Sequence, residues 1–334
     1  MGGFRNILVV VKQTPYEHYL QLKAQGKAPV ALRWKRLKNR YETHSLCVKS
    51  VEEVLQYSGV SYNVIGREEM HRGSFAGKDL VIAVGGDGTV MNASSFLDNR
   101  IPVLGVNSDP SHPMESQSKK PVDERRSRGA LCAATATNVQ TVLPIMLTGE
   151  ITPGIRTRLR CTVRSTHTET RLPPSLNDIL VAHPIPAAVS RFRVTLFEKG
   201  EGSENTFSAP PLIDSDPDEG SSLFSFNIWS SGMWICTATG STAAMHAAGG
   251  SPMELRSKEL QYLVREPLMD VNDPKIMDLT KGIIDDKHKL VMRWNSQEGQ
   301  VYVDGSHMKH NLELGDELTF DNNAPEINMF DPII

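Results

Sequence analysis

The chain has 334 residues, of which 39% are hydrophobic and 22% are charged, so it has enough apolar material for two domains. Its formal net charge of −3 excludes the strongly basic surface with which proteins bind nucleic-acid duplexes. The four cysteines, Cys47, Cys132, Cys161 and Cys236, lie far apart, which argues against both a zinc ribbon and a secreted disulfide framework.

Targeting and membrane signals are absent from the sequence pattern. No apolar stretch has the length of a membrane span or of a signal-peptide core, and Asn6 stands where a myristoylation signal has Ser or Thr. We therefore expect no membrane or nucleic-acid partner. The expected location is the cytoplasm, with the peroxisome or another organelle left open.

The first hundred residues alternate between strand and helix patterns. Residues 7–11 and 62–65 are short apolar runs typical of buried strands. Between them, Ser50 followed by Glu53 is the pattern of a capping box, which predicts a helix that starts at Val51 and is closed by Gly59. Such alternation favours a parallel sheet with helical crossovers.

The most informative stretch is an apolar run, residues 80–84, that leads into three glycines around one carboxylate. Gly85, Gly86 and Gly88 have no Cβ, so backbone N–H groups can approach a phosphate closely. Asp87 repels phosphate, which makes sense if it holds a metal ion or accepts a proton from an attacking hydroxyl. The simpler alternative is a glycine-rich turn with an Asx hydrogen bond.

The elements after this turn continue the pattern. Thr89 is expected to start a helix over residues 89–96 whose N-terminus points at the glycine turn. Residues 102–106 form the next predicted strand, the polar residues 111–128 a mobile loop, and residues 138–147 a helix closed by Gly149.

The pattern changes near Gly154, where apolar and polar residues begin to alternate. Period-two alternation predicts half-exposed antiparallel strands, and residues 198–222 predict exposed loops. The expected fold class is therefore α/β, with a Rossmann-like parallel-sheet domain over residues 1–150 and a β-rich domain over residues 151–334. Whether the C-terminal tail returns to the first domain stays open.

Two further polar stretches mark candidate binding positions in the β-rich half. Asn177 and Asp178 precede an apolar run, which places both side chains at the start of a strand, although Asn and Asp are also ordinary in strand-entry turns. Residues 237–248 are mostly small, with a helix expected from Thr242, so that backbone can approach a ligand at a helix N-terminus.

Three motifs resemble known families. Gly85-Gly86-Asp87-Gly88-Thr89 resembles the motif shared by NAD kinases, by diacylglycerol and sphingosine kinases and, less closely, by 6-phosphofructokinases. Residues 230–243 are similar to the second NAD kinase motif, and Asn177-Asp178 resembles that family's Asn-acidic pair. Lipid kinases differ after the first motif, so the conjunction resembles the NAD kinase family, in particular its plant NADH kinase and mitochondrial NAD kinase branch.

This resemblance implies a function and a set of site residues. It implies ATP-dependent phosphorylation of the 2′-hydroxyl on the adenosine ribose of NADH or NAD, with Mg²⁺, in a homodimer, at a site between the two domains. Asp87 would be the general base, and a role as metal ligand stays open. The implied nucleotide-binding residues are Gly85, Gly86, Gly88, Thr89, Asn177, Asp178, Thr239, Gly240, Ser241, Thr242, Ala243 and Ala244.

The sequence departs from the family pattern at two positions. The family has Asp where this chain has Ser231, which leaves the preference between NAD and NADH open. It has Tyr where this chain has Ala244, which removes a stacking or packing surface. Two other functions remain, a lipid kinase of the same superfamily and a non-catalytic NADP(H)-binding regulator. We expect no protein-held metal site, because His307 and His310 have no third ligand placed beside them.

Overall fold

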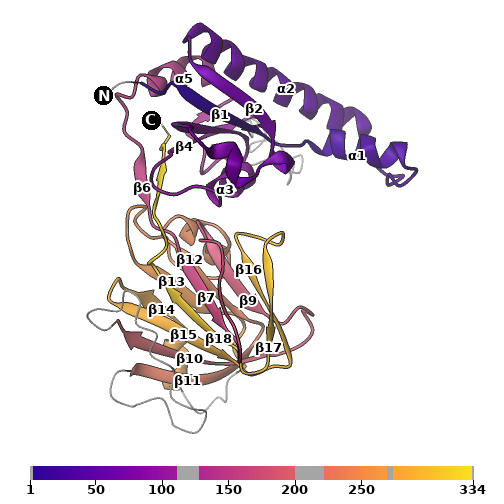
Figure 1. The fold of residues 1–334 in the computed structure, drawn as a ribbon. Coiled ribbons are helices and arrows are strands. Elements are labelled where there is room, and N and C mark those ends of the chain that lie inside the picture. Colours follow the sequence, from indigo (N-terminus) through magenta and orange to yellow (C-terminus); the bar gives the residue numbers. More distant parts are fainter. Residues whose placement is uncertain (1–2, 111–127, 200–221, 269–273, 333–334) are drawn as a thin grey trace. The chain divides into compact units, whose positions relative to one another are not determined.

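The computed structural model describes residues 3–110, 128–199, 222–268 and 274–332, which form two compact units (Figure 1). Unit 1 comprises Met1–Ile155 and Glu326–Ile334, and unit 2 comprises Arg156–Pro325. Almost all of the two predicted loops, residues 111–128 and 198–222, lies outside the described residues. No helix within the described ranges is long and apolar enough to cross a membrane.

Unit 1 is built on a mostly parallel sheet with strand order β2-β1-β3-β4-β19-β6, to which β5 adds beside β4. Its elements are β1 (Asn6–Val11), α1 (Pro15–Ala24), α2 (Trp34–Tyr57), β2 (Ser61–Gly66), β3 (Leu80–Gly85), α3 (Asp87–Ser94), β4 (Val103–Asn107), β5 (Ala134–Thr135), α5 (Val139–Leu147), β6 (Gly154–Arg156) and β19 (Ile327–Met329), with 3₁₀ turns at Arg67–Glu69 and Arg72–Phe75.

Helices cover both faces of this sheet. Leu80, Ile82 and Val84 of β3 pack in one core with apolar residues of α2 and α5, which lie on the same side of the sheet (Figure 1). Val81 and Ala83 are fully buried on the opposite face, where α3 packs. A strand that is buried on both faces explains why residues 80–84 are uniformly apolar.

Unit 2 is a sandwich of two six-stranded antiparallel sheets, with orders β11-β10-β15-β18-β7-β8 and β14-β13-β12-β9-β16-β17. Inward-facing side chains of both sheets form one core, in which Phe192 stacks on Trp294 with ring centroids 6.1 Å apart. Its elements are β7 (Arg160–Arg164), β8 (Glu169–Arg171), β9 (Asp178–Ala182), β10 (Ser190–Glu198), β11 (Ser222–Ser230), β12 (Met233–Thr237), a 3₁₀ turn (Gly240–Thr242), α6 (Ala244–Ala247), β13 (Leu260–Val264), α7 (Pro274–Leu279), β14 (Lys281–Ile284), β15 (His288–Trp294), β16 (Glu298–Val303), β17 (Lys309–Glu313) and β18 (Glu317–Asp321).

The structure confirms the expected α/β class and the strands around the glycine turn, corrects the helices expected at Val51 and Thr242, and adds one helix. The predicted start at Val51 is wrong, because Ser50 and Glu53 lie inside the continuous helix α2. A capping box does occur at Thr14 and Glu17, at the start of α1, a helix that we did not predict. The helix expected from Thr242 is instead a 3₁₀ turn followed by the four-residue α6.

Candidate functional site

The glycine turn joins a buried strand directly to a helix. β3 ends at Gly85, Gly86 is the N-cap, and α3 begins at Asp87, two residues before the predicted start. Gly85 must lack a side chain, because a Cβ there would lie 2.2 Å from the Thr89 Oγ1. The Gly88 N–H has no acceptor among the described residues, so it remains available to an anion at this helix N-terminus.

Asp87 is held by the backbone of a neighbouring segment. Its two carboxylate oxygens accept hydrogen bonds from the N–H of Leu131 at 2.9 Å and from the N–H of Gly129 at 3.2 Å. Gly129 has a positive φ of 73°, and a Cβ there would lie 2.5 Å from the Asn107 Nδ2. The carboxylate orientation is therefore fixed by backbone donors, which is the pre-organisation that a proton acceptor or metal ligand needs.

A cavity of about 210 Å³ opens at this turn. Four of the predicted residues line it together: Gly86, Asp87, Gly88 and Thr89. It is also lined by residues that we had not assigned to a site: Lys12, Gln13, Arg67, Asn107 and Asp109. A sequence signal exists for three of them, since Lys12, Arg67 and Asn107 each stand at or just after the carboxyl end of a predicted strand, and parallel strands end at the same sheet edge.

A buried polar network connects the glycine turn to helix α2. The Ser108 hydroxyl donates to the Gly85 carbonyl at 3.2 Å and lies 2.8 Å from the His44 Nδ1. Burial, and then the Lys12 ammonium, lower the pKa of His44 to about 4, so this imidazole is neutral near pH 7. Helix α2 is thus linked to the glycine turn through the neutral His44 imidazole and the Ser108 hydroxyl.

In unit 2, one carboxylate organises the predicted Asn-Asp pair. Asp304, at the β16–β17 turn with a positive φ of 50°, accepts hydrogen bonds from the Ser175 hydroxyl at 2.6 Å and from three consecutive N–H groups. These belong to Leu176 at 2.8 Å, Asn177 at 2.8 Å and Asp178 at 3.2 Å. In the sequence, residues 301–305 resemble a late Val-Asp-Gly strand and turn of the NAD kinase family, although Asp-Gly also marks many hairpins. The contact of Asp304 with Asn177 spans more than a hundred residues, so the fold and not the local pattern reveals it.

Asp178 is a buried acid whose carboxylate accepts no hydrogen bond from the described residues. Its exposed fraction is 8%, and burial, followed by the neighbouring Asp304 carboxylate, raises its pKa to about 7. A carboxyl group kept half-protonated near neutral pH can both donate to and accept from a ligand hydroxyl. Perturbed acids of this kind concentrate at functional sites.

The residues after β12 form a tight loop against this pair. Gly240 is required there, because a Cβ would lie 2.1 Å from the Asn177 carbonyl oxygen. The Thr239 Oγ1 is buried and has no hydrogen-bond partner in the part of the chain that the structure describes, whereas the Ser241 hydroxyl donates to the Ala238 carbonyl and accepts from the Met253 N–H.

The structure therefore brings Asn177, Asp178, Thr239 and Gly240 together in unit 2. Thr242 and Ala243 are exposed and Ala244 is half-buried at the start of α6.

A carboxylate lies beside Ser231, one of the two positions at which the sequence differs from the family pattern. The Ser231 hydroxyl donates to the Glu266 side chain, and the Ser231 N–H donates to the Arg265 carbonyl at 3.1 Å. Glu266 has a φ of 39°, which is rare for a residue with a side chain. The acidic group that the family pattern has at position 231 is thus present nearby, on a different strand end.

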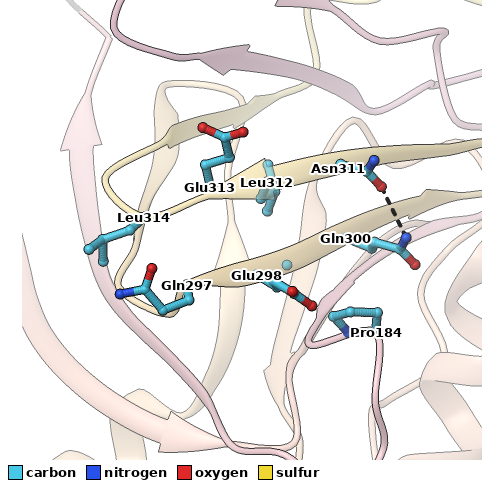
Figure 2. A pocket seen from close by; sticks show the side chains of 9 residues that line it. Pro184, Gln297, Glu298, Gln300, Asn311, Leu312, Glu313 and Leu314 are labelled. Carbon is cyan, nitrogen blue, oxygen red and sulfur yellow. Dashed lines mark hydrogen bonds between the residues drawn. The ribbon is translucent and has the colours of Figure 1, made fainter.

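The larger cavity of about 500 Å³ in unit 2 lies over the β16–β17 hairpin (Figure 2). The carboxylates of Glu298 and Glu313 line it, and the Gln300 amide donates to Asn311 at 3.0 Å. It contains none of the predicted site residues, and two acidic side chains disfavour a phosphate ligand. The smaller cavity at Asp87 is therefore the candidate phosphate site.

Within the described ranges, no three His, Cys, Asp or Glu side chains gather as a protein-held metal centre. The Asp87 cavity nevertheless offers hard oxygen ligands, the carboxylates of Asp87 and Asp109, and these fit a Mg²⁺ ion that also contacts phosphates.

A parallel α/β unit with a carboxylate in a glycine turn, followed by a β-sandwich with an Asn-acidic strand entry, defines a class of nucleotide-dependent phosphotransferases. A family model described as the ATP-NAD kinase N-terminal domain matches residues 23–109. The chain is 37% identical to a protein named NADH kinase from Arabidopsis thaliana, over 98% of this chain and 96% of that protein.

A protein named probable NADH kinase from Oryza sativa is 38% identical, over 89% of this chain and 84% of that protein. Among solved structures, yeast NADH kinase complexed with NADH has the same fold, with a TM-score of 0.66 at 17% identity, over 100% of this chain and 85% of that one. The chain belongs to the NAD kinase family.

Proposed function

We propose that the chain is an NAD(H) kinase, which transfers the γ-phosphoryl group of ATP to the 2′-hydroxyl on the adenosine ribose of NADH or NAD. The observation that carries the proposal is Asp87, a carboxylate fixed by two backbone N–H groups inside a glycine-lined cavity suited to phosphate, in a chain of this family. The relatives named NADH kinase support the choice of a dinucleotide acceptor.

The chemistry requires one proton transfer and one phosphoryl transfer. The ribose 2′-oxygen forms a bond to the γ-phosphorus, the bond from that phosphorus to the β–γ bridging oxygen breaks, and ADP leaves. Asp87 accepts the hydroxyl proton and releases it to water after the transfer. Because phosphoryl transfer depends mostly on alignment and charge neutralisation, we expect positioning by the glycine turn to supply more of the acceleration than proton transfer.

Asp87 and Asp109 are the residues of this cavity that would hold Mg²⁺ together with the donor phosphates. When bound, the ion would neutralise charge on the phosphate oxygens. If Asp87 is a metal ligand rather than the base, the Asp87→Asn variant should recover rate at raised Mg²⁺ concentration.

Dinucleotide binding is assigned to unit 2. Among the described residues, no group donates a hydrogen bond to the buried Asp178 carboxylate and none pairs with the Thr239 hydroxyl, so the first is suited to a ribose hydroxyl and the second is available to the same ligand. Asp304 would act on binding indirectly, because it fixes the backbone that carries Asn177 and Asp178.

The test is a phosphorylation assay of the purified protein with Mg-ATP and, separately, NAD, NADH and diacylglycerol. We expect turnover with at least one dinucleotide and a loss of roughly 100-fold or more in kcat for Asp87→Asn. Asp98→Asn is the matched control, because Asp98 is another acid of unit 1, pairs with Arg100 on the surface and lies outside the cavity.

Two results would contradict the proposal. Phosphorylation of diacylglycerol but of neither dinucleotide would assign the chain to the lipid kinases. Tight NADP(H) binding without turnover would make it a regulator. If Asp87→Asn keeps the full wild-type rate, the family assignment stands but Asp87 is not the base.

We propose further that the protein is a homodimer and that it works in the cytoplasm. Four free, buried cysteines suit a reducing compartment. Within the described residues, β17 is the last strand of its sheet and offers a pairing surface to a second copy. Light scattering coupled to size-exclusion chromatography tests the first point, since a mass of one chain at assay concentration would contradict it. Imaging of the tagged full-length protein in cells tests the second.

A further inference from the structure

Lys12 stands beside the glycine turn, although no motif points to it. It follows the last residue of β1, and its N–H donates to the Val84 carbonyl at 3.1 Å, so the backbone continues the ladder next to β3. Its Cβ lies 3.2 Å from the position that a Cβ on Gly85 would take. The side chain lines the same cavity as Gly86 and Asp87.

The Lys12 ammonium makes no hydrogen bond and no ion pair within the part of the chain that the structure describes. Its neighbour Asp109 pairs instead with Arg40, at 3.4 Å, and both of those side chains are mostly buried. Arg67, the other cation that lines the cavity, pairs with Glu68 at 3.0 Å. Among the described residues around this cavity, Lys12 therefore carries the positive charge that no side chain neutralises.

An unpaired, desolvated cation is costly in a folded protein. Burial lowers the pKa of Lys12, and Asp109 only partly opposes that effect. A buried cation that no protein group stabilises is explained when an anionic ligand supplies the opposite charge. The cavity already presents the N–H of Gly88 and a helix N-terminus, both of which suit an anion.

We propose that Lys12 binds the phosphate chain of the donor nucleotide in the Asp87 cavity, an inference that rests on the phosphotransferase function proposed above. An ammonium there would offset the repulsion between the phosphates and Asp87, which otherwise places like charges in one small cavity. Lys12 would then be a substrate-binding residue.

The experiment compares Lys12→Met with Lys12→Arg and with the control Lys27→Met, which removes an exposed lysine of the same unit outside the cavity. Two quantities are measured for each: the KM values for ATP and NADH, and the affinity for inorganic tripolyphosphate with Mg²⁺ by titration calorimetry. We expect Lys12→Met to weaken tripolyphosphate and to raise the KM for ATP by roughly 10- to 100-fold, with the KM for NADH unchanged. Lys12→Arg should recover part of the loss, and Lys27→Met should match the wild type.

The outcomes separate this inference from the function on which it rests. If the wild type phosphorylates NAD(H) and Lys12→Met keeps wild-type values for ATP and tripolyphosphate, the Lys12 assignment is overturned and the function stands. If only the affinity for NADH falls, Lys12 contacts the dinucleotide and the donor assignment is wrong. If no dinucleotide is phosphorylated but tripolyphosphate binding depends on Lys12, the function falls and the phosphate site stands.

A ligand-free thermal melt guards against a folding defect. Replacing an unpaired ammonium by an apolar side chain of similar length should leave the Tm of Lys12→Met equal to or above that of the wild type. A lower Tm for both Lys12→Met and Lys12→Gln would show that the charge serves the fold, which contradicts the proposal.

Discussion

Asp178 combines deep burial, a carboxylate neighbour and no hydrogen-bond donor among the described residues. Its usual pKa of 3.8 rises to about 7 in the folded chain, so the folded state retains a proton that the unfolded state has lost. The free energy of unfolding must therefore fall as pH rises from about 4 to about 7, and it is constant with respect to this group above that range. The stabilisation that comes from protonating Asp178 is complete only below pH 3.8, the pKa of this carboxyl group in the unfolded chain.

The corresponding prediction concerns Asp178→Asn, which cannot ionise. We expect this variant to gain stability relative to the wild type as pH rises, by roughly 2 to 3 kcal/mol between pH 5 and pH 8. Urea unfolding at several pH values measures the difference, with Asp278→Asn as the control, since Asp278 is an exposed acid of the same unit. A stability difference that does not change with pH would show that Asp178 ionises normally.

The sequence alone was enough to predict features that are formed by neighbouring residues in the chain. Gly85, Gly86 and Asp87 stand together in the chain, so their turn could be predicted. Lys12 and Asp304 contact residues that are distant in sequence, and the local pattern around each, a lysine after one strand and an Asp-Gly pair in one hairpin, does not name those partners. Their contacts follow only from strand register and burial.

At the scale of elements, α2 shows why a local signal can mislead. Cys47, Val51 and Leu55 form one buried stripe at helical spacing, so tertiary packing carries the helix straight through Ser50. The Ser50–Glu53 pattern resembles a cap, but no Gly or Pro interrupts the preceding residues. The competing principle is the burial of a continuous apolar face, which outweighs a preference of about 1 kcal/mol.

This difference is measurable. Ser50→Ala should stabilise the protein slightly, by about 0.5 kcal/mol, because Ala is the better residue inside a helix. Thr14→Ala should destabilise it by about 1 kcal/mol, because Thr14 is a true N-cap in a reciprocal pair with Glu17. Denaturant unfolding of both variants gives the sign. If Ser50→Ala costs as much as Thr14→Ala, a helix does start at Ser50.

At the scale of the whole molecule, the chain leaves unit 1 near Ile155 and returns to it at Glu326. The returning strand β19 pairs in parallel with β4, where Met329 is opposite Val103. Phe330 is buried in the unit 1 core, with its ring centroid 6.0 Å from that of Phe4. The two units have separate hydrophobic cores.

Substitution in one core should therefore act mainly on its own unit. Phe330→Ala should cost roughly 3 to 5 kcal/mol and lower hydrogen-exchange protection in β1, β3 and β4, while β10 and β15 keep theirs. Phe192→Ala should give the mirror result. Equal loss of protection in both units for either variant would show that the two cores unfold as one cooperative body.

The return of residues 326–330 to the first sheet also matters during synthesis on the ribosome. All residues of the sandwich are translated before β19, so the strand beside β4 is supplied only by a segment that emerges after the sandwich. Until then the nascent sheet has an unpaired edge and an open position where Phe330 will pack. A message that ends before β19 would yield a complete sandwich attached to an incomplete unit 1, a product that cellular quality control should remove.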